Sequence, residues 1–160
     1  MTLASTTRIR LCAFAPGDAA QIAGLWRRAW ISAHGDTAIV EPIGHWLARV
    51  QAEFGPPSSV ALLERDEHLL GFMVMQPARH YVAQLFVDAH LQRRGYGKAL
   101  LDHASRRMPV GWRLHVATAN LGAQRFYERQ GLARGVIDRH PQTGVERISF
   151  HWRPSLVQGE

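Results

Sequence analysis

The spacing of apolar residues along the chain predicts a series of short strands. In residues 8–14 charged and apolar side chains alternate, as in a half-buried strand. Two apolar runs at 59–63 and 69–75 flank the charged residues 64–67 and predict an antiparallel hairpin. The run 81–87 extends this hairpin into a meander. Further strands are predicted around Trp112, Leu114 and Val116, over Val136 and Ile137, and over 148–150.

Apolar residues spaced three and four positions apart predict helices between these strands. Asp18 and Gln21 have the spacing of a capping box, so the first helix is predicted to begin at Asp18. Asn120 is a favoured helix cap and Gly131 a favoured helix stop, and they bound the last helix. The other two helices are predicted over 41–54, before the breaker 55–57, and over 95–107.

The order of these elements is strand, two helices, three strands, helix, strand, helix, two strands. It predicts an α+β fold of a single domain, residues 1–160, with a mixed and mostly antiparallel central sheet and helices on both faces. The step from strand 81–87 through helix 95–107 to the strand at Trp112 requires a crossover, so these two strands should be parallel. Ligands of such units bind at the carboxyl ends of the strands.

The composition is that of a globular chain, with 46% hydrophobic and 20% charged residues in a length of 160. No apolar stretch is long enough to span a bilayer, and residues 1–10 lack the apolar core of a secretory signal. We therefore expect a soluble, cytoplasmic protein. The single cysteine, Cys12, and the lack of zinc-site spacing exclude a disulfide scaffold and a zinc finger.

Basic residues outnumber acidic residues by 19 to 13, which gives a formal charge of +6, and Lys98 is the only lysine. This surplus favours anionic partners without choosing among nucleic acid, a membrane surface and a phosphorylated small molecule. Arginine usage set by genomic base composition is an equal alternative. The position of the basic residues along the chain therefore matters more than their number.

Basic residues gather in the segment 92–99, between a predicted strand and a predicted helix. The glycines of this segment allow its backbone N–H groups to approach an anion closely, and a helix start adds a partial positive charge. Arg93, Arg94 and Lys98 surround the same point. A tight turn with solvated arginines is the alternative interpretation.

Two common phosphate-binding motifs do not fit this segment. The dinucleotide fingerprint requires a third glycine where the chain has Leu100. The P-loop requires a glycine in place of Gln92 and a serine or threonine in place of Ala99. The segment therefore matches neither motif.

Two groups of residues together resemble the GCN5-related N-acetyltransferase (GNAT) family. The first group is Leu85-Phe86-Val87-Asp88 followed by Gln92-Arg93-Arg94-Gly95-Tyr96-Gly97. The second runs from Asn120 through Ala123 and Phe126-Tyr127-Glu128 to Gly131-Leu132. The two groups span residues 82–132 at the spacing typical of the family. The resemblance implies a GNAT-like fold, acetyl coenzyme A as cosubstrate and no metal.

The resemblance also implies how the cofactor is held. Leu85, Phe86 and Val87 would make sheet-like hydrogen bonds to the pantetheine arm, beside a bulge that separates two strands. The backbone N–H near Val87 would face the thioester carbonyl and stabilise the oxyanion. The pyrophosphate would lie against the loop and helix start formed by Gln92, Arg93, Arg94, Gly95, Tyr96, Gly97 and Lys98.

Two residues of the second group have implied roles near the thioester. Asn120 corresponds to the family's asparagine beside the pantetheine, and it also suits a helix cap. Tyr127 corresponds to the tyrosine that protonates the departing thiolate. A phenol can donate its proton at neutral pH because its reference pKa is about 10. A packed core aromatic is the alternative for Tyr127.

The acceptor amine must lose a proton before or during its attack, because an ammonium group has no lone pair. Some family members carry a glutamate five residues before the asparagine, where this chain has His115. An imidazole with a reference pKa of about 6.5 can serve as this base. His115 as a plain polar strand residue is the alternative. His80, Tyr81 and Gln84 on the neighbouring strand are other candidates, acting through ordered water.

The acceptor pocket of this family is formed by the first two helices and the last two strands. Trp26 and Trp30 lie four residues apart on the first of these helices, a spacing more often found in a core than in a substrate pocket. If they face the cleft, they favour a small amine with an apolar or aromatic body. Ala89 stands where many members have proline, and the remaining histidines have no metal-site spacing.

The sequence thus predicts an N-acetyltransferase that moves the acetyl group of acetyl coenzyme A to the primary amine of a small molecule, by direct attack in a ternary complex. The alternatives are a protein or peptide N-acetyltransferase and a non-catalytic acyl coenzyme A sensor. A nucleic-acid binder is least favoured, because aromatics and basic residues are not interleaved on one element. We expect no membrane partner. Pairing of two chains into a homodimer through a strand edge stays open.

Overall fold

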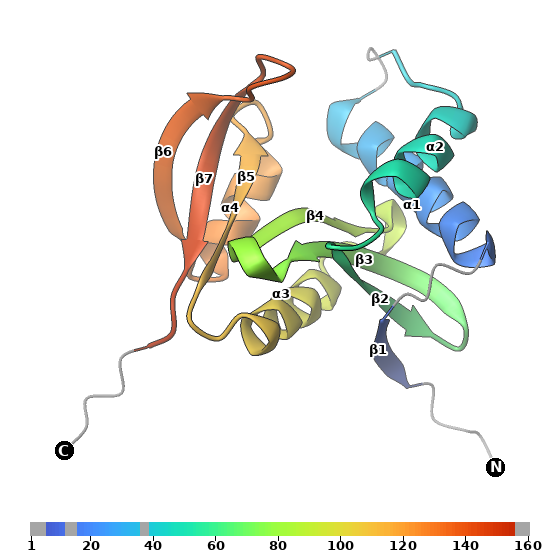
Figure 1. Ribbon diagram of the computed structural model, residues 1–160, viewed down its shortest axis with the longest axis horizontal. Coiled ribbons are helices and arrows are strands. Elements are labelled where there is room, and N and C mark those ends of the chain that lie inside the picture. Colours follow the sequence, from blue (N-terminus) through green and yellow to red (C-terminus); the bar gives the residue numbers. More distant parts are fainter. Residues whose placement is uncertain (1–5, 12–15, 36–38, 156–160) are drawn as a thin grey trace.

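The structure, a computed structural model, describes residues 6–11, 16–35 and 39–155. A seven-stranded sheet with the strand order β1-β2-β3-β4-β5-β7-β6 forms its centre (Figure 1). The strands are β1 (Thr7–Leu11), β2 (Ser59–Arg65), β3 (His68–Gln76), β4 (Tyr81–Val87), β5 (Trp112–Ala117), β6 (Ala133–Arg139) and β7 (Glu146–Trp152). The helices are α1 (Pro16–His34), α2 (Ile43–Glu53), α3 (Tyr96–Arg107) and α4 (Leu121–Arg129), with short 3₁₀ turns η1 (Pro77–Arg79) and η2 (Ala89–Leu91).

Neighbouring strands of the sheet are antiparallel, with one exception. β4 and β5 are parallel, and α3 provides the crossover between them. The sheet is therefore mixed and mostly antiparallel. The predicted α+β fold class is confirmed.

Each face of the sheet has its own hydrophobic core. On one face α1 and α2 pack against β2, β3 and β4 through a cluster that includes Trp26, Trp46 and Phe72. On the other face α3 and α4 pack against the sheet through a cluster that includes Leu100, Tyr127 and Phe150. In the described part of the chain, β5, β6 and β7 contribute no residue to the first core. Figure 1 shows α1 and α2 standing apart from these three strands.

The predicted start of the first helix at Asp18 is wrong. α1 begins at Pro16, so Asp18 lies within its first turn. The Asp18 carboxylate accepts a hydrogen bond of 2.8 Å from the Arg10 guanidinium of β1. The same guanidinium donates a 2.7 Å hydrogen bond to Glu64 of β2, so one cation joins β1, β2 and α1. Residues 12–14 of the predicted first strand lie outside the described residues.

The last two strands are longer than predicted. Polar residues on both sides of the apolar pairs continue the β6–β7 ladder, from Ala133 opposite His151 to Arg139 opposite Glu146. The hydrophobic pattern does not predict the ends of a strand well when both faces of the strand are exposed to solvent. β6 is such a strand, because six of its seven residues are exposed.

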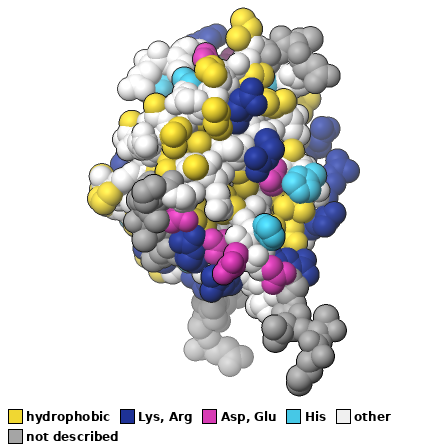
Figure 2. Space-filling view, turned by 90° about the vertical axis from the view of Figure 1, so that its right-hand side faces the viewer, with side chains coloured by type: hydrophobic (Ala, Val, Ile, Leu, Met, Phe, Trp, Pro, Cys, Tyr) yellow, Lys and Arg dark blue, Asp and Glu magenta, His cyan; other side chains and the backbone are white. Residues whose placement is uncertain are grey.

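Several of the basic residues form ion pairs with carboxylates. The view in Figure 2 shows Lys and Arg side chains dispersed among acidic and uncharged ones on that face of the molecule. Pairs with separations of 2.6–3.1 Å join Arg10 to Glu64, Arg28 to Asp88, Arg49 to Glu53, Lys98 to Asp102, Arg134 to Glu128, and Arg147 to Asp138. Among the described helices none is both long and apolar enough to cross a membrane.

Trp26 is the centre of the first core, with 2% of its surface exposed and its ring 5.1 Å from the rings of Trp46 and Phe54. We expect Trp26→Ala to reduce the free energy of unfolding by about 3–5 kcal/mol, because it removes a large buried side chain and leaves a cavity. Urea denaturation followed by circular dichroism measures this loss. Ile43→Ala on α2, where Ile43 is 53% exposed, is the control and should stay within about 0.5 kcal/mol.

Candidate functional site

A cleft opens between β4 and β5 because these parallel strands are joined only at their beginnings. Tyr81 and Arg113 are the single pair of Cα partners in the ladder. The Arg113 N–H donates a hydrogen bond of 3.0 Å to the His80 carbonyl oxygen. Beyond this junction the strands diverge and enclose a cleft of about 190 Å³. The cleft lies at the carboxyl ends of the two strands, where the crossover unit predicts a ligand.

A β-bulge in β4 accompanies this divergence. Val74 of β3 is opposite Gln84, whereas the next residue, Met75, is opposite Val82. Ala83 is therefore the extra residue of the bulge. Because a bulge bends a strand and increases its local twist, it turns the second half of β4 away from β5.

The backbone of β4 beyond the bulge presents free hydrogen-bonding groups to the cleft. The Asp88 N–H donates to the Leu70 carbonyl oxygen at 2.8 Å, so Asp88 and Leu70 are a hydrogen-bonded pair of the antiparallel ladder. Such pairs alternate with pairs whose N–H and C=O groups point away from the partner strand. Leu85 and Val87 belong to the non-hydrogen-bonded pairs, so their N–H and C=O groups point away from β3 and toward the space between β4 and β5. Leu85 and Phe86 line the cleft, and Val87 does not.

The glycine-containing loop precedes α3, and its two glycines have different structural roles. Gly95 is the N-cap of α3 and has a φ of 82°, which only glycine adopts without strain. Gly97 is helical, and a Cβ atom there would lie 2.8 Å from Cζ of Phe126 on α4. The second glycine is therefore required by close packing of α3 against α4. The sequence interpretation differs, because it explained both glycines by the approach of the backbone to an anion.

The start of α3 has the features that favour an anion. No side chain caps the helix, and the first intrahelical bond is donated by Ala99, to the Gly95 carbonyl oxygen at 3.1 Å. The N–H groups of Tyr96, Gly97 and Lys98 thus point out of the helix end. The Arg93 backbone before them has a φ of 67°, which is uncommon for a residue with a side chain and holds the loop in a bent conformation.

The three basic side chains of the loop are in different situations. Arg93 and Arg94 are exposed, and neither has a carboxylate partner within the described segments. Lys98 Nζ lies 2.7 Å from the Asp102 carboxylate one turn further along α3. Gln92, in extended backbone conformation, connects η2 to this loop. Two of the three expected cations are therefore available to an anion, and the third is shared with Asp102.

Asn120 and Tyr127 both line the cleft from α4. The Asn120 Oδ1 accepts a 3.1 Å hydrogen bond from the Ala123 N–H, so this residue is the N-cap of α4. Its amide nitrogen is left to donate to a ligand. Tyr127 is 7% exposed, with its ring 5.7 Å from that of Phe150. Burial raises the pKa of the Tyr127 hydroxyl, which therefore keeps its proton at neutral pH.

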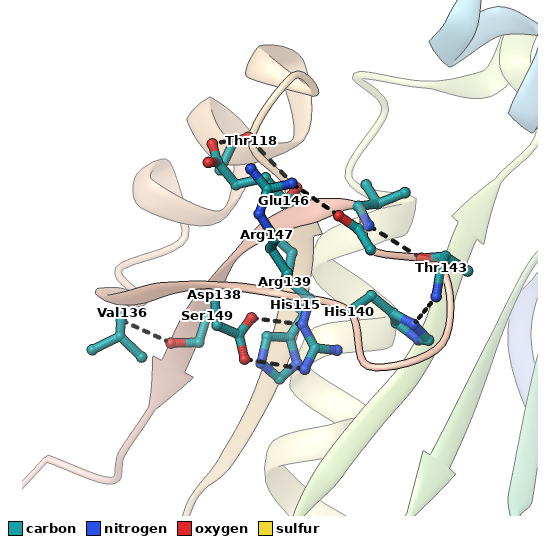
Figure 3. Close-up of polar contacts among 12 residues, drawn as sticks. His115, Thr118, Val136, Asp138, Arg139, His140, Thr143, Glu146, Arg147 and Ser149 are labelled. Carbon is teal, nitrogen blue, oxygen red and sulfur yellow. Dashed lines mark hydrogen bonds and ion pairs between the residues drawn. The ribbon is translucent and has the colours of Figure 1, made fainter.

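His115 lines the cleft from β5 and is hydrogen-bonded to Tyr81. The Tyr81 hydroxyl oxygen and the His115 Nδ1 are 2.7 Å apart. Burial lowers the pKa of His115, and the nearby Arg147 lowers it further. Figure 3 shows His115 beside Asp138 and Arg147, whose side chains form an ion pair of 2.7 Å. The structure thus brings two of the predicted base candidates into direct contact and keeps His115 neutral at pH 7.

The ion pair between Arg28 and Asp88 was not predicted from the sequence. The Arg28 guanidinium donates to both Asp88 carboxylate oxygens, at 3.2 and 2.8 Å. Burial favours a higher pKa of Asp88, but these bonds and the Ala89 N–H hold it below the ordinary value. The pair fixes α1 to the end of β4, just before the glycine loop. The spacing of charges in the sequence contains no signal for it, because the two residues are 60 positions apart.

The aromatic residues of the first two helices divide between the core and the surface. Trp26 and Trp46 are 2% and 3% exposed and belong to the core. Trp30 is partly exposed and stacks on His34, with ring centroids 3.9 Å apart. No group of three or more His, Cys, Asp or Glu side chains in the described residues is arranged to hold a metal ion.

The model of the Acetyltransferase (GNAT) family matches residues 19–132. The chain therefore belongs to this family of acyltransferases. It is 40% identical over 68 residues to the peptidyl-lysine N-acetyltransferase YiaC of Escherichia coli strain K12. That match covers 42% of this chain and 45% of YiaC, so it spans less than half the length of the curated relative.

Solved structures with the same fold include two N-acetyltransferases of low sequence identity. The ribosomal-protein-S18-alanine N-acetyltransferase of Escherichia coli is 22% identical, with a TM-score of 0.68 over 97% of both chains. The PaiA N-acetyltransferase of Thermoplasma acidophilum, in complex with coenzyme A, is 16% identical, with a TM-score of 0.67 over 91% of this chain and 99% of PaiA. At these identities the likeness establishes the fold.

Proposed function

We propose that this protein transfers the acetyl group of acetyl coenzyme A to a primary amine by direct attack in a ternary complex. The observation that carries the proposal is the cleft between β4 and β5. It connects the uncapped start of α3 and the free backbone groups of β4 with Tyr127 and His115. Family membership and the coenzyme A complex of PaiA support the same cosubstrate.

The pyrophosphate of the cofactor binds at the start of α3. The N–H groups of Tyr96, Gly97 and Lys98 donate to its oxygens, and Arg93 and Arg94 neutralise its charge. The pantetheine arm extends along β4 and pairs with the backbone of Leu85 and Val87, as a further strand would. The Asn120 amide donates to the arm from the opposite wall of the cleft.

The chemistry requires one proton donor and one proton acceptor. The amine nitrogen attacks the thioester carbon, and the backbone N–H near Val87 stabilises the oxyanion of the tetrahedral intermediate. When the carbon–sulfur bond breaks, the Tyr127 hydroxyl gives its proton to the departing thiolate. His115 takes the proton that the amine loses. With Nδ1 donating to the Tyr81 oxygen, Nε2 holds the lone pair that accepts this proton.

The class of acceptor has two candidates. A small-molecule amine is the prediction from the sequence. YiaC, a peptidyl-lysine N-acetyltransferase, and the ribosomal-protein-S18-alanine N-acetyltransferase favour an amine on a protein instead. A protein acceptor also suits the β6–β7 hairpin, where Val136, Ile137 and Val145 are 74%, 58% and 52% exposed. A non-catalytic sensor would bind coenzyme A without turning it over.

Changing Tyr127 to Phe tests the proton donor. We expect kcat for acceptor-dependent thiol release to fall by about 100- to 10,000-fold, the usual contribution of a general acid. The dissociation constant of acetyl coenzyme A, measured by calorimetry, should change little, because the ring still fills its site. Unchanged turnover in Tyr127→Phe would remove the acid role. Tight binding of acetyl coenzyme A by the native protein, with no release on a broad panel of amines, would identify a sensor.

Changing Arg93 and Arg94 to Ala tests the anion site. We expect each change to weaken coenzyme A binding by roughly tenfold, since a charge-assisted hydrogen bond contributes about 1.5 kcal/mol. The matched control is Arg106→Ala with Arg107→Ala, two exposed arginines at the far end of the same helix. Equal effects at both ends of α3 would show a general charge effect. Pantetheine, which lacks the phosphate groups of coenzyme A, should bind equally to all variants.

The pH dependence of kcat at saturating acceptor tests the base. Because the pKa of His115 is lowered, the imidazole is neutral above its ordinary value of about 6.5 and becomes charged only at lower pH. We expect kcat to be level near pH 7 and to fall with the protonation of His115 below about pH 6.5. His115→Gln should abolish this acidic limb and lower the plateau. An acidic limb that persists in His115→Gln would assign the base to another group.

A further inference from the structure

Within the described residues, no helix covers the face of β5 that carries His115. Trp112, Leu114 and Val116 point into the core under α3 and α4. The alternation of a strand therefore places Arg113 and His115 on the opposite face. α1 and α2 cover that face over β2–β4, but the described residues of β5–β7 do not join their core. Arg113 is exposed and His115 half-buried on a surface open to an acceptor.

Two arginines flank the Tyr81–His115 hydrogen bond on this face. The guanidinium carbons of Arg79 and Arg113 each lie 5.7 Å from the centre of the Tyr81 ring. Arg79 donates to the neutral Gln76 side chain at 3.0 Å. In the parts of the chain that the structure describes, neither arginine has a carboxylate within ion-pair distance. Both therefore present an uncompensated positive charge beside the cleft.

The carboxylates nearest to this surface are already engaged. Asp138 accepts hydrogen bonds of 2.7 and 3.2 Å from Arg147 (Figure 3). Glu146 accepts a 2.8 Å hydrogen bond from the Thr118 hydroxyl. Asp138 therefore balances Arg147. The Thr118 hydroxyl is neutral and leaves the charge of Glu146 in place, so the two cations Arg79 and Arg113 exceed it by one. The surface around the proposed base has a net positive charge.

A cationic surface is unfavourable for a simple alkylamine, which is an ammonium ion at neutral pH. It is favourable for an acceptor that carries an anion a few atoms from its amine. Carboxylates match the fork of an arginine side chain, which can donate two parallel hydrogen bonds. With the carboxylate held by arginines, the same positive field favours the neutral form of the amine, which is the form that attacks.

We propose that the acceptor is an amine with a neighbouring carboxylate, and that Arg79 and Arg113 select it by binding that carboxylate. This inference rests on the proposed acetyl transfer and adds its substrate class. Two sources have this chemistry: a free amino acid, and a peptide with acidic residues next to the acetylated amine. Arg79 and Arg113 determine specificity and take no part in proton transfer.

Matched acceptors distinguish the charge from the source. The peptide arm uses three blocked tripeptides, with a central lysine flanked by Glu, by Gln or by Arg. The small-molecule arm compares β-alanine with its amide, which differ only in the carboxylate. Free-thiol release from acetyl coenzyme A gives kcat/KM for each acceptor. We expect the acidic acceptor of the productive arm to exceed its neutral counterpart by about threefold to tenfold at low salt. Turnover in the peptide arm identifies an acidic peptide as the acceptor, and turnover in the small-molecule arm identifies a free amino acid.

Charge reversal tests the two arginines directly. In Arg79→Glu with Arg113→Glu, the preference should invert, so that the Arg-flanked peptide or the amide becomes the better acceptor. The matched control is Arg125→Glu with Arg129→Glu, two exposed arginines on α4, which packs on the other face of the sheet from Arg113. This control changes the net charge by the same amount and should keep the native preference. Raising the ionic strength should reduce the preference, because the sites are exposed.

The outcomes separate this inference from the function on which it rests. No thiol release with any acceptor overturns the proposed acetyl transfer. Turnover with equal kcat/KM for acidic and neutral acceptors overturns the carboxylate-bearing acceptor alone. A preference that survives charge reversal removes Arg79 and Arg113 as its cause. An unchanged dissociation constant for coenzyme A in the double variant confirms that the cofactor site is intact.

Discussion

The junction between β4 and β5 is the constraint on which the site depends. A single ladder pair, Tyr81 with Arg113, holds the two parallel strands together, and the bond from the Arg113 N–H to the His80 carbonyl oxygen belongs to this junction. Immediately beyond it the bulge at Ala83 turns β4 away. A fully paired parallel sheet would satisfy these backbone groups and close the cleft. The separation instead leaves hydrogen-bonding groups of β4 available to pair with a ligand.

The two cores allow this interrupted sheet to be stable. α3 and α4 cover both halves of the sheet on one face and bridge the divergence, with Leu100, Tyr127 and Phe150 in one continuous cluster. α1 and α2 cover only the first half on the other face. The same asymmetry buries Tyr127, which stays protonated, and leaves His115 at the boundary with solvent. The proposed proton donor and the proposed proton acceptor therefore line the same cleft in different environments.

Much of the fold follows from local patterns. The predicted helices and strands all occur, because their apolar spacing, their turn residues and the Asn120 cap agree with the tertiary packing. The errors arise where a residue of another helix or strand contacts the predicted one. Asp18 has capping-box spacing, but Arg10 of β1 binds its carboxylate. The sequence links Gly97 to the binding of an anion, whereas the structure shows that a side chain at this position would clash with Phe126. Neither partner is recognisable from local sequence.

The sequence by itself determined the order of elements, the crossover between two parallel strands, the loop at the start of α3 and the candidate residues Asn120, Tyr127 and His115. These depend on neighbours in the chain, so periodicity and motif spacing reveal them. The tertiary structure decided which of these groups meet. The contact of Tyr81 with His115 joins residues 34 positions apart, and the ion pair of Arg28 with Asp88 joins residues 60 positions apart. The positive charges of Arg79 and Arg113 stay uncompensated because of where the neighbouring carboxylates lie. Only the register of the sheet and the packing of its faces set those distances.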